Sequence, residues 1–254
     1  MDAKDKNETR TAHIKNVTCA AVAGGAFGKC GEIGEITIPD TVEVIERGAF
    51  AKCVRLREVT LCCRLKKCGA CIFGTAKKLH FHIMPGAEIE WLNSDNKYLR
   101  EVRVSGKNAN ISAGMFHHCE RLETAVIDEG ITAIGAGAFD CCYSLRNISI
   151  PRSVGAVGAM AFAYCIELTD ITLPPELKSI ERGTFMHCTD LERVVIPDNV
   201  RSIGENAFYG CSSLREVVLP ANLRSIGNNA FAECGRLKLT IPAPVEYNGK
   251  KLIF

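Results

Sequence analysis

The chain has 254 residues, of which 47% are hydrophobic and 24% are charged, and its formal net charge is +2. This composition is typical of a soluble globular or repeat protein with enough apolar residues for a core. The near-neutral charge argues against a dedicated nucleic-acid-binding protein, which would carry a concentrated basic face. No segment approaches the roughly 20 consecutive apolar residues that a membrane-spanning helix needs.

The sequence contains 14 cysteines, a high number for its length. In a short secreted domain such a number would predict a disulfide framework. This chain is long and rich in aliphatic residues, and its first residues (MDAKDKNETRTAH) lack the apolar segment of a signal peptide. We therefore expect reduced thiols and a cytoplasmic location, with the cell surface reached by a leaderless route as the alternative.

A repeat of 23 residues runs through nearly the whole chain. It is marked by phenylalanines at that interval: Phe27, Phe50, Phe73, and then Phe116, Phe139, Phe162, Phe185, Phe208 and Phe231. The interval between Phe73 and Phe116 is 43 residues, which equals one unit of 20 residues followed by one of 23. A degenerate unit therefore lies in this interval, with Asn93 in place of the phenylalanine.

Each unit contains one short alternating stretch and one stretch with small residues that ends in Ala-Phe. Alternating apolar residues, such as Val194 and Ile196, predict a short strand that buries every second side chain. A proline such as Pro197 often follows and ends the strand, because it lacks an N–H donor. The segment around the phenylalanine is long enough for a single helical turn of short α or 3₁₀ type. One unit cannot bury its apolar residues alone, so we predict an α/β repeat solenoid of about ten stacked coils.

The pattern L--I-IP--V--I---AF--C, which describes this unit, resembles the repeats of the BspA-like (Treponema-type) leucine-rich-repeat family. The resemblance covers the chain from about Ile14 to Pro242. It implies a leucine-rich-repeat horseshoe with a parallel sheet on the concave face and short α or 3₁₀ turns on the convex side. It also implies a binding or adhesion module without enzymatic activity. The chain departs from the pattern between Cys62 and Trp91, where we expect irregular curvature.

Eight cysteines share one position, three residues after the phenylalanine: Cys30, Cys53, Cys119, Cys142, Cys165, Cys188, Cys211 and Cys234. One helical turn would place each of them on the same side as the phenylalanine, facing the core. Stacked side chains point the same way, which disfavours disulfides, and a column does not bring four ligands to one zinc ion. We interpret the column as packing, because a buried cysteine acts as a small hydrophobe with a weak S–H donor.

The run CCRLKKCGAC contains the pair Cys68-x-x-Cys71, which suggests a zinc or redox site. The repeat register places Cys68 in the core and Cys71 in a turn, and the nearby His80 and His82 belong to the next strand. We therefore predict no metal site. We interpret Cys63 and Cys71 as surface thiols that react faster than the buried column.

The sequence carries no HExxH, GxSxG or GxxxxGK[ST] motif of catalysis or phosphate binding. The run from Gly135 to Gly137 is the turn before a phenylalanine, not a dinucleotide loop. His117 and His118 follow Phe116 directly, and the repeat places no nucleophile or carboxylate beside them. We therefore predict no enzyme, no catalytic residue and no cofactor, and a thiol- or zinc-dependent activity is the least favoured alternative.

Strand side chains that point away from the core form the predicted partner-binding surface, at the eighth and tenth positions after the phenylalanine. Phe81 and Ile83 fall at these positions and, with the single tryptophan Trp91, are candidate interface anchors. The alternative is that the shortened unit turns Phe81 and Trp91 inward. If Phe81 is exposed, Phe81→Glu should leave folding intact and abolish partner binding. The full set of candidates is Glu35, Glu58, Phe81, Ile83, Trp91, Glu101, Arg103, Val126, Asp170, Arg193, Val195, Glu216 and Val218.

The predicted organisation is a disordered polar tail (1–13), a solenoid (14–242, irregular over about 62–104) and a capping hairpin (243–254). The pair Asn248-Gly249 indicates the hairpin. The predicted function is a monomeric, non-catalytic scaffold or interaction module that binds a protein partner on the concave face. A cell-surface adhesin that binds host or matrix proteins is the alternative, and we expect neither nucleic-acid binding nor membrane insertion.

Overall fold

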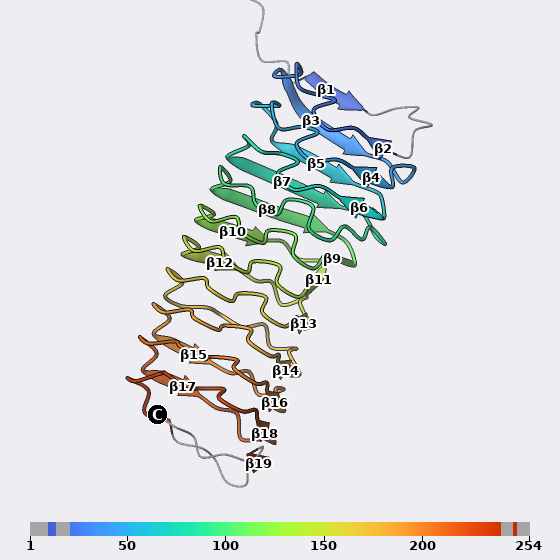
Figure 1. Ribbon diagram of the computed structural model, residues 1–254. Coiled ribbons are helices and arrows are strands. Elements are labelled where there is room, and N and C mark those ends of the chain that lie inside the picture. Colours follow the sequence, from blue (N-terminus) through green and yellow to red (C-terminus); the bar gives the residue numbers. More distant parts are fainter. Residues whose placement is uncertain (1–9, 14–20, 240–245, 248–254) are drawn as a thin grey trace, which may run out of the picture.

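The computed structural model describes residues 10–13, 21–239 and 246–247. These residues wind into an elongated stack of coils, and every paired strand is parallel to its neighbour in the adjacent coil (Figure 1). The stack runs from the N-terminal to the C-terminal coil without folding back on itself (Figure 1). The parallel solenoid predicted from the repeat is therefore confirmed.

Most coils contribute one strand to each of two sides of the stack, which we call the long-strand side and the short-strand side (Figure 1). The long-strand side consists of a seven-stranded sheet and, after a break, a two-stranded sheet: β1 (Arg10–His13), β3 (Ile33–Ile38), β5 (Glu58–Leu61), β7 (Lys78–Ile83), β8 (Glu101–Gly106), β10 (Thr124–Ile127), β12 (Asn147–Ser149), then β15 (Arg193–Val195) and β17 (Glu216–Val218). The short-strand side consists of three smaller sheets: β2 (Ala21–Val22), β4 (Val44–Ile45) and β6 (Lys67–Cys68); β9 (Ala109–Ile111), β11 (Ile131–Ile134) and β13 (Ala156–Val157); β14 (Ser179–Ile180), β16 (Ser202–Ile203), β18 (Ser225–Ile226) and β19 (Glu246–Tyr247).

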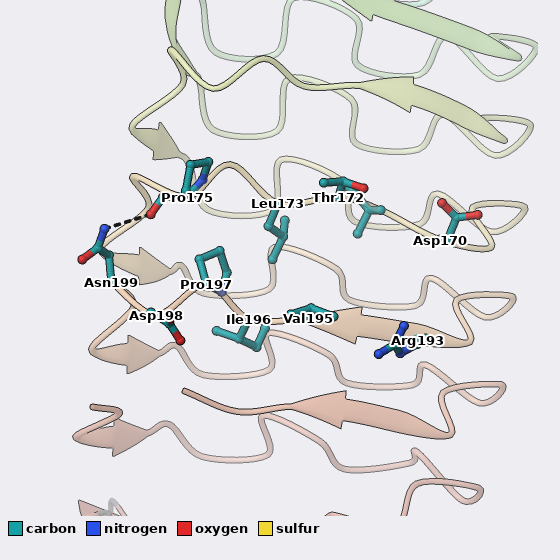
Figure 2. Close-up of a pocket in the computed structure, with 11 residues that line it drawn as sticks. Asp170, Thr172, Leu173, Pro175, Arg193, Val195, Ile196, Pro197, Asp198 and Asn199 are labelled. Carbon is teal, nitrogen blue, oxygen red and sulfur yellow. Dashed lines mark hydrogen bonds between the residues drawn. The ribbon is translucent and has the colours of Figure 1, made fainter. Parts of the chain in front are cut away.

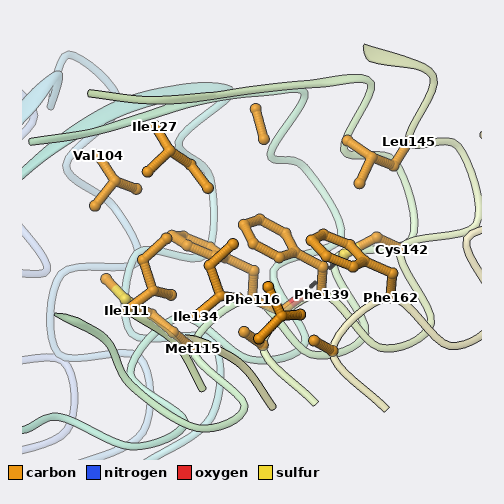
Figure 3. Packing of buried hydrophobic residues seen from close by; sticks show 14 of the residues in the cluster. Val104, Ile111, Met115, Phe116, Ile127, Ile134, Phe139, Cys142, Leu145 and Phe162 are labelled. Atoms are coloured by element: carbon orange, nitrogen blue, oxygen red, sulfur yellow. Dashed lines mark hydrogen bonds between the residues drawn. The ribbon is translucent and has the colours of Figure 1, made fainter. Parts of the chain in front are cut away.

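A column of stacked phenylalanine rings fills the interior between the two sides (Figure 3). The rings of Phe139 and Phe162 are nearly parallel, with centroids 5.5 Å apart, and Phe185 continues the stack at 5.6 Å. Ile127 and Ile134, from the two sides of the same coil, lie on opposite sides of the rings (Figure 3). Because each ring is buried only when coils lie above and below it, a unit is stable only within a stack.

The segment around each phenylalanine is a non-helical turn. The described residues contain no helix, so none of them belongs to a helix that could cross a membrane. The residue two before each phenylalanine has positive φ, and from Phe116 onward so does the residue two after it, for example Gly137 (58°) and Cys141 (60°) around Phe139. Positive φ interrupts a right-handed helix. Instead, the N–H groups of Phe139 and Cys141 donate to the next coil, to the carbonyls of Ala161 (2.8 Å) and Ala163 (2.9 Å). In the described coils, hydrogen bonds between coils therefore take the place of the predicted helical turns, and the number of coils stays a prediction.

Strand β7 departs from the repeat register, and this departure shows that the predicted exposure of Phe81 and Ile83 is wrong. Both side chains are buried, with 0% and 4% of their surface exposed, and the outward side chains are those of His80 and His82. Phe81 pairs with the core residue Val59, which stands one repeat position further along its own unit. A displacement of one residue exchanges the two faces of a strand, so the assignments made from the repeat at the eighth to tenth positions are inverted in β7, whereas Leu79 at the sixth position keeps its place in the core.

The inversion has a packing cause, because Phe81 fills the gap that Asn93 leaves in the ring column. The Phe81 ring makes edge-on contacts with Phe73 at 5.8 Å and with Phe116 at 5.7 Å. Asn93 and Asn96 are both buried, and the Asn96 amide donates to the Asn93 side chain and to the Phe73 carbonyl, each at 3.2 Å. The column is therefore continuous, although one of its rings comes from a strand rather than from a turn.

The cysteine column is buried beside the rings, and its thiols also act as hydrogen-bond donors. Each donating Sγ lies near the carbonyl of the residue at the phenylalanine position of the preceding coil, for example Cys165 to Phe139 at 3.3 Å and Cys188 to Phe162 at 3.1 Å. The other donors of this kind are Cys53, Cys119, Cys142, Cys211 and Cys234. In the degenerate unit the Asn96 amide makes the equivalent bond. The column thus combines small apolar volume with a donor for a buried carbonyl.

The predicted domain boundaries fall partly outside the described residues. Arg10–His13, within the predicted tail, form β1 and pair with β3. Glu246–Tyr247 form β19 and pair in parallel with β18. The predicted hairpin turn at Asn248-Gly249 lies outside the described residues, so the three boundaries stay predictions.

Candidate interaction surface

The outward side chains of the long-strand side form one exposed surface, which we call the strand surface. The predicted partner-binding residues that lie on it are Glu35, Glu58, Glu101, Arg103, Val126, Asp170, Arg193, Val195, Glu216 and Val218. They alternate with buried neighbours, as the two-residue period of a strand requires. Phe81 and Ile83 do not belong to this surface, because they are buried.

Oppositely charged residues on neighbouring coils pair across the strand surface. The pairs are Lys78–Glu101 (2.5 Å), Arg103–Asp128 (2.8 Å) and Arg193–Glu216 (3.1 Å). Most of these side chains are exposed, so each pair contributes only about 0–1 kcal/mol to stability. The pairing cancels these charges locally.

Strand β7 brings two histidines to the strand surface beside Glu58 of β5. His80 Nδ1 lies 3.0 Å and His82 Nε2 lies 2.7 Å from the same oxygen, Glu58 Oε2. On their other side, His80 Nε2 and His82 Nδ1 lie 3.1 and 3.0 Å from the Ser105 hydroxyl of β8. Burial, followed by the neighbouring His82, lowers the pKa of His80. A hollow of about 460 Å³ lies alongside, lined in part by Glu58, His80 and Arg103.

The long-strand side is interrupted between β12 and β15, and a second hollow lies at the interruption (Figure 2). The intervening coil contributes no strand to this side, and only Asp170 makes an isolated bridge, to Arg193. The hollow has a volume of about 630 Å³ and is lined by Asp170, Ile171, Thr172, Leu173, Pro175, Arg193, Val195, Ile196, Pro197, Asp198 and Asn199.

Two valines extend the apolar lining of this hollow onto the open surface. Val195 pairs directly with Val218 of β17, and their side chains are 47% and 40% exposed. Single exposed valines are common on proteins, but two in register beside a hollow form an apolar patch of the kind that partner proteins cover. Arg193 and Glu216, in the same two strands, form a paired polar rim beside the patch.

Trp91 is exposed, as one prediction required, but it lies on a turn rather than on the strand surface. Its side chain is 44% exposed and contacts the His117 ring edge-on, with centroids 5.0 Å apart. His117 Nε2 lies 3.4 Å from the Asp140 carboxylate, so the turn does place a carboxylate beside the histidine pair. Burial, followed by the neighbouring His118, lowers the pKa of His117. The sequence does not reveal this cluster, because its members come from three different coils.

The cysteines of the irregular unit do not come together at one metal site. Cys63 is fully buried, contrary to its predicted surface position, and burial raises the pKa of its thiol to about 12. Cys68 and Cys71 are half-buried, and the Cys71 thiol donates to a backbone carbonyl at 3.1 Å. Among the described residues, no group of three metal-binding side chains includes a cysteine, and the single such group is the Glu58–histidine cluster.

We expect the thiols of the folded protein to be alkylated in the order of their exposure. Burial raises the pKa of Cys142 and Cys165 far above the ordinary range, so the reactive thiolate is scarce and the reagent has no access. With iodoacetamide at mildly alkaline pH, the half-buried Cys62 and Cys71 should react first, and Cys63 should react with the buried group. Peptide mass spectrometry over a time course measures the order. Equal rates for Cys71 and Cys165 would contradict it.

The coils, the ring column and the exposed strand surface define a class of protein, a parallel β-solenoid built from leucine-rich repeats. The family model described as the BspA type leucine rich repeat region matches residues 20–143 and 132–253, with six copies. The chain belongs to this BspA-type leucine-rich-repeat family, as the repeat pattern indicated.

Solved structures of similar proteins agree with this assignment. A leucine-rich-repeat protein of T. pallidum is 27% identical, with a TM-score of 0.50 over 65% of this chain and 72% of that chain. A leucine-rich-repeat protein from Bacteroides ovatus is 24% identical, with a TM-score of 0.53 over 89% of this chain and 71% of that chain, and supports the fold alone. No curated protein matches the sequence. Leucine-rich-repeat proteins of this kind generally serve as protein-interaction or adhesion modules and are typically not enzymes.

Proposed function

We propose that the chain is a non-catalytic interaction module that binds a protein partner on the strand surface. The observation that carries this proposal is the exposed pair Val195 and Val218 beside the hollow between β12 and β15. A partner segment laid across these strands would bury both valines, and each Å² of apolar surface so buried contributes about 25 cal/mol. Arg193 and Glu216 would then form a polar rim that orients the partner.

The proposal extends along the same surface toward the N-terminal coils. Glu35, Glu101, Arg103 and Val126 lie on strands of the seven-stranded sheet and would supply polar contacts to an elongated partner. A partner that covered both hollows would have to follow the stack of coils, so an extended or convex surface fits best. We propose that the chain is a monomer before it binds.

The proposed location is the cytoplasm, because the cysteine column uses reduced thiols as hydrogen-bond donors. Oxidation would remove the S–H donor and leave a buried carbonyl with one bond fewer. An adhesin at the cell surface would present the same strand surface to its ligand. Protease treatment of intact cells separates the two: a cytoplasmic chain stays intact, and an adhesin is cleaved.

Replacing both valines by aspartate should abolish partner binding without unfolding the protein. Val195→Asp/Val218→Asp places two charges in the proposed apolar contact. Val54, a 56% exposed valine in a turn, gives the matched control Val54→Asp. Cross-linking and affinity capture on the immobilised full chain should retain the same proteins with wild type and V54D. The double variant should retain at least about tenfold less, which corresponds to roughly 1.4 kcal/mol. Equal capture by the double variant, at an unchanged thermal midpoint, would place the binding site elsewhere.

A further inference from the structure

We propose that Glu58, His80 and His82 form a binding site for a divalent transition-metal ion, with zinc as the ion that fits best. The three side chains come from the neighbouring strands β5 and β7, and each offers a ligand atom within 4.8 Å of the others. This site goes beyond the proposed protein interaction and does not depend on it.

The distances between the ligand atoms suit a small ion. Glu58 Oε2 lies 3.0 Å from His80 Nδ1 and 2.7 Å from His82 Nε2. Zinc binds nitrogen and oxygen at about 2.0–2.2 Å, so two ligands of a tetrahedral site stand roughly 3.3 Å apart. The cluster therefore needs to open by only a few tenths of an ångström. The side chains are half-buried at the surface, and this leaves room for that adjustment.

The hydrogen bonds of the cluster place a ring lone pair beside the carboxylate. His82 Nε2 bonds to Glu58 Oε2 at 2.7 Å, and His80 Nε2 and His82 Nδ1 bond to the Ser105 hydroxyl at 3.1 and 3.0 Å. Neutral rings satisfy these three bonds when His82 Nε2–H donates to Glu58, the Ser105 hydroxyl donates to His82 Nδ1 and His80 Nε2–H donates to Ser105. The Nδ1 lone pair of His80 then lies 3.0 Å from Glu58 Oε2, so two electron-rich atoms stand together at a position that favours a cation.

A metal ion beside Glu58 would bind this lone pair together with that of His82 Nε2. Both rings then direct a lone pair at the ion, together with the carboxylate oxygen. Their N–H groups, on the opposite edges, both donate to the Ser105 oxygen. The Ser105 hydroxyl is left to donate to the Phe81 carbonyl, which lies 3.4 Å away. Ser105 thus orients both ligating rings, the role that outer hydrogen bonds play in zinc sites.

The ligand types and the surroundings favour zinc over calcium or magnesium. Two imidazoles with one carboxylate are a common zinc ligand set, whereas calcium and magnesium are hard ions that prefer oxygen ligands. The nearest positive charge on the same surface, Arg103, is paired with Asp128, and Glu35 lies in register beside Glu58 on the other side. Three protein ligands leave at least one coordination position open toward the adjacent hollow, which can take water or a donor group of another molecule.

The test must separate this cluster from the many cysteines, which also bind zinc. The full chain is reduced, stripped of metal with a chelator and titrated with zinc chloride by calorimetry. Wild type should bind with a component that is lost in His80→Asn/His82→Asn. The matched control His187→Asn changes a histidine of another coil and should keep it. Glu58→Gln and Ser105→Ala should each weaken this component by about 10- to 100-fold, the second through ring orientation alone.

Cobalt(II) identifies the ligand atoms directly. The component that is lost in the double histidine variant should show ligand-field bands of nitrogen and oxygen coordination without a thiolate charge-transfer band. All four variants carry changes to residues outside the core, so their thermal midpoints should match wild type in the absence of metal. The proposal is overturned if the double histidine variant binds zinc as wild type does, if the cobalt spectrum reports thiolate ligands only, or if no saturable binding is observed.

Discussion

Phe81→Ala should destabilise the solenoid by about 3–5 kcal/mol, the usual result of emptying a large core site. Phe81 is fully buried and contacts the rings on both sides of the gap at Asn93, so its loss removes two aromatic contacts and opens a cavity in the ring column. Phe81→Glu should prevent the N-terminal and C-terminal coils from stacking, since a buried carboxylate would have no partner.

Urea unfolding followed by circular dichroism measures this effect. The matched control is Thr60→Ala, an outward residue of the neighbouring strand β5, which should change the unfolding free energy by less than about 0.5 kcal/mol. Because coils of a solenoid can unfold in groups, the comparison rests on the midpoints of both variants under the same conditions. Equal midpoints for F81A and T60A would show that Phe81 is not a core residue.

A double-mutant cycle tests whether Phe81 takes the place of the missing phenylalanine. Asn93→Phe alone should destabilise the protein, because the new ring would compete with Phe81 and break the bond between Asn93 and Asn96. In the background Phe81→Val the same change should be less harmful, since the new ring enters the space that Phe81 leaves. The coupling should be about 1–3 kcal/mol in favour of the double variant. If the effects of Asn93→Phe and Phe81→Val on stability were additive, Phe81 would not occupy the space of the missing phenylalanine.

Cys165→Ala should destabilise the protein by about 1–2 kcal/mol, and Cys165→Ser by at least as much. Alanine removes the sulfur volume and leaves the Phe139 carbonyl with one bond fewer. Serine keeps a donor, but its shorter C–O bond leaves the hydroxyl too far from a carbonyl that the sulfur reaches at 3.3 Å, so a buried hydroxyl is poorly satisfied. A column explained by packing and a column explained by the hydrogen bond alone therefore predict different stabilities for the serine variant.

Thermal and urea midpoints of both variants measure the difference. The control is Cys71→Ala, because this half-buried thiol lies in a turn and its removal opens no cavity in the column. If Cys165→Ser had the same stability as wild type, the hydrogen bond alone would explain the column. If alanine had no effect, neither packing nor the hydrogen bond at Cys165 would matter.

The sequence predicted the fold because each stacked coil must present the same apolar positions to its neighbours. A run of aligned phenylalanines and strand residues therefore identifies the solenoid without any knowledge of contacts. The turn conformation could not be predicted in the same way, because glycine and cysteine adopt positive φ at equivalent positions and the hydrogen bonds that stabilise them come from the next coil.

The candidate site was predictable only where the repeat is regular. Val195 and Val218 follow the unit, and their outward positions were predicted correctly. The Glu58–histidine cluster could not be found, because counting from Phe73 puts Phe81 and Ile83 on the outward face and His82, at the ninth position, in the core. Asn93 carries a signal that could have revealed the cluster. It stands where the column needs a ring, so another aromatic residue must fill that space, and Phe81 is the nearest aromatic residue on a strand of the preceding unit.

The displaced strand β7 changes which repeat position supplies each row of outward side chains. Glu35 and Glu58 stand in one row across the strands, at the eighth position of their units, and this row continues through His80 into Arg103 and Val126, which hold the tenth position. The rows themselves stay in register, but the repeat position that supplies each row changes by two residues between the N-terminal and C-terminal parts of the surface. A partner that recognised the side chains at one repeat position would therefore meet them in two rows, displaced along the strands by two residues, with the histidines at the boundary.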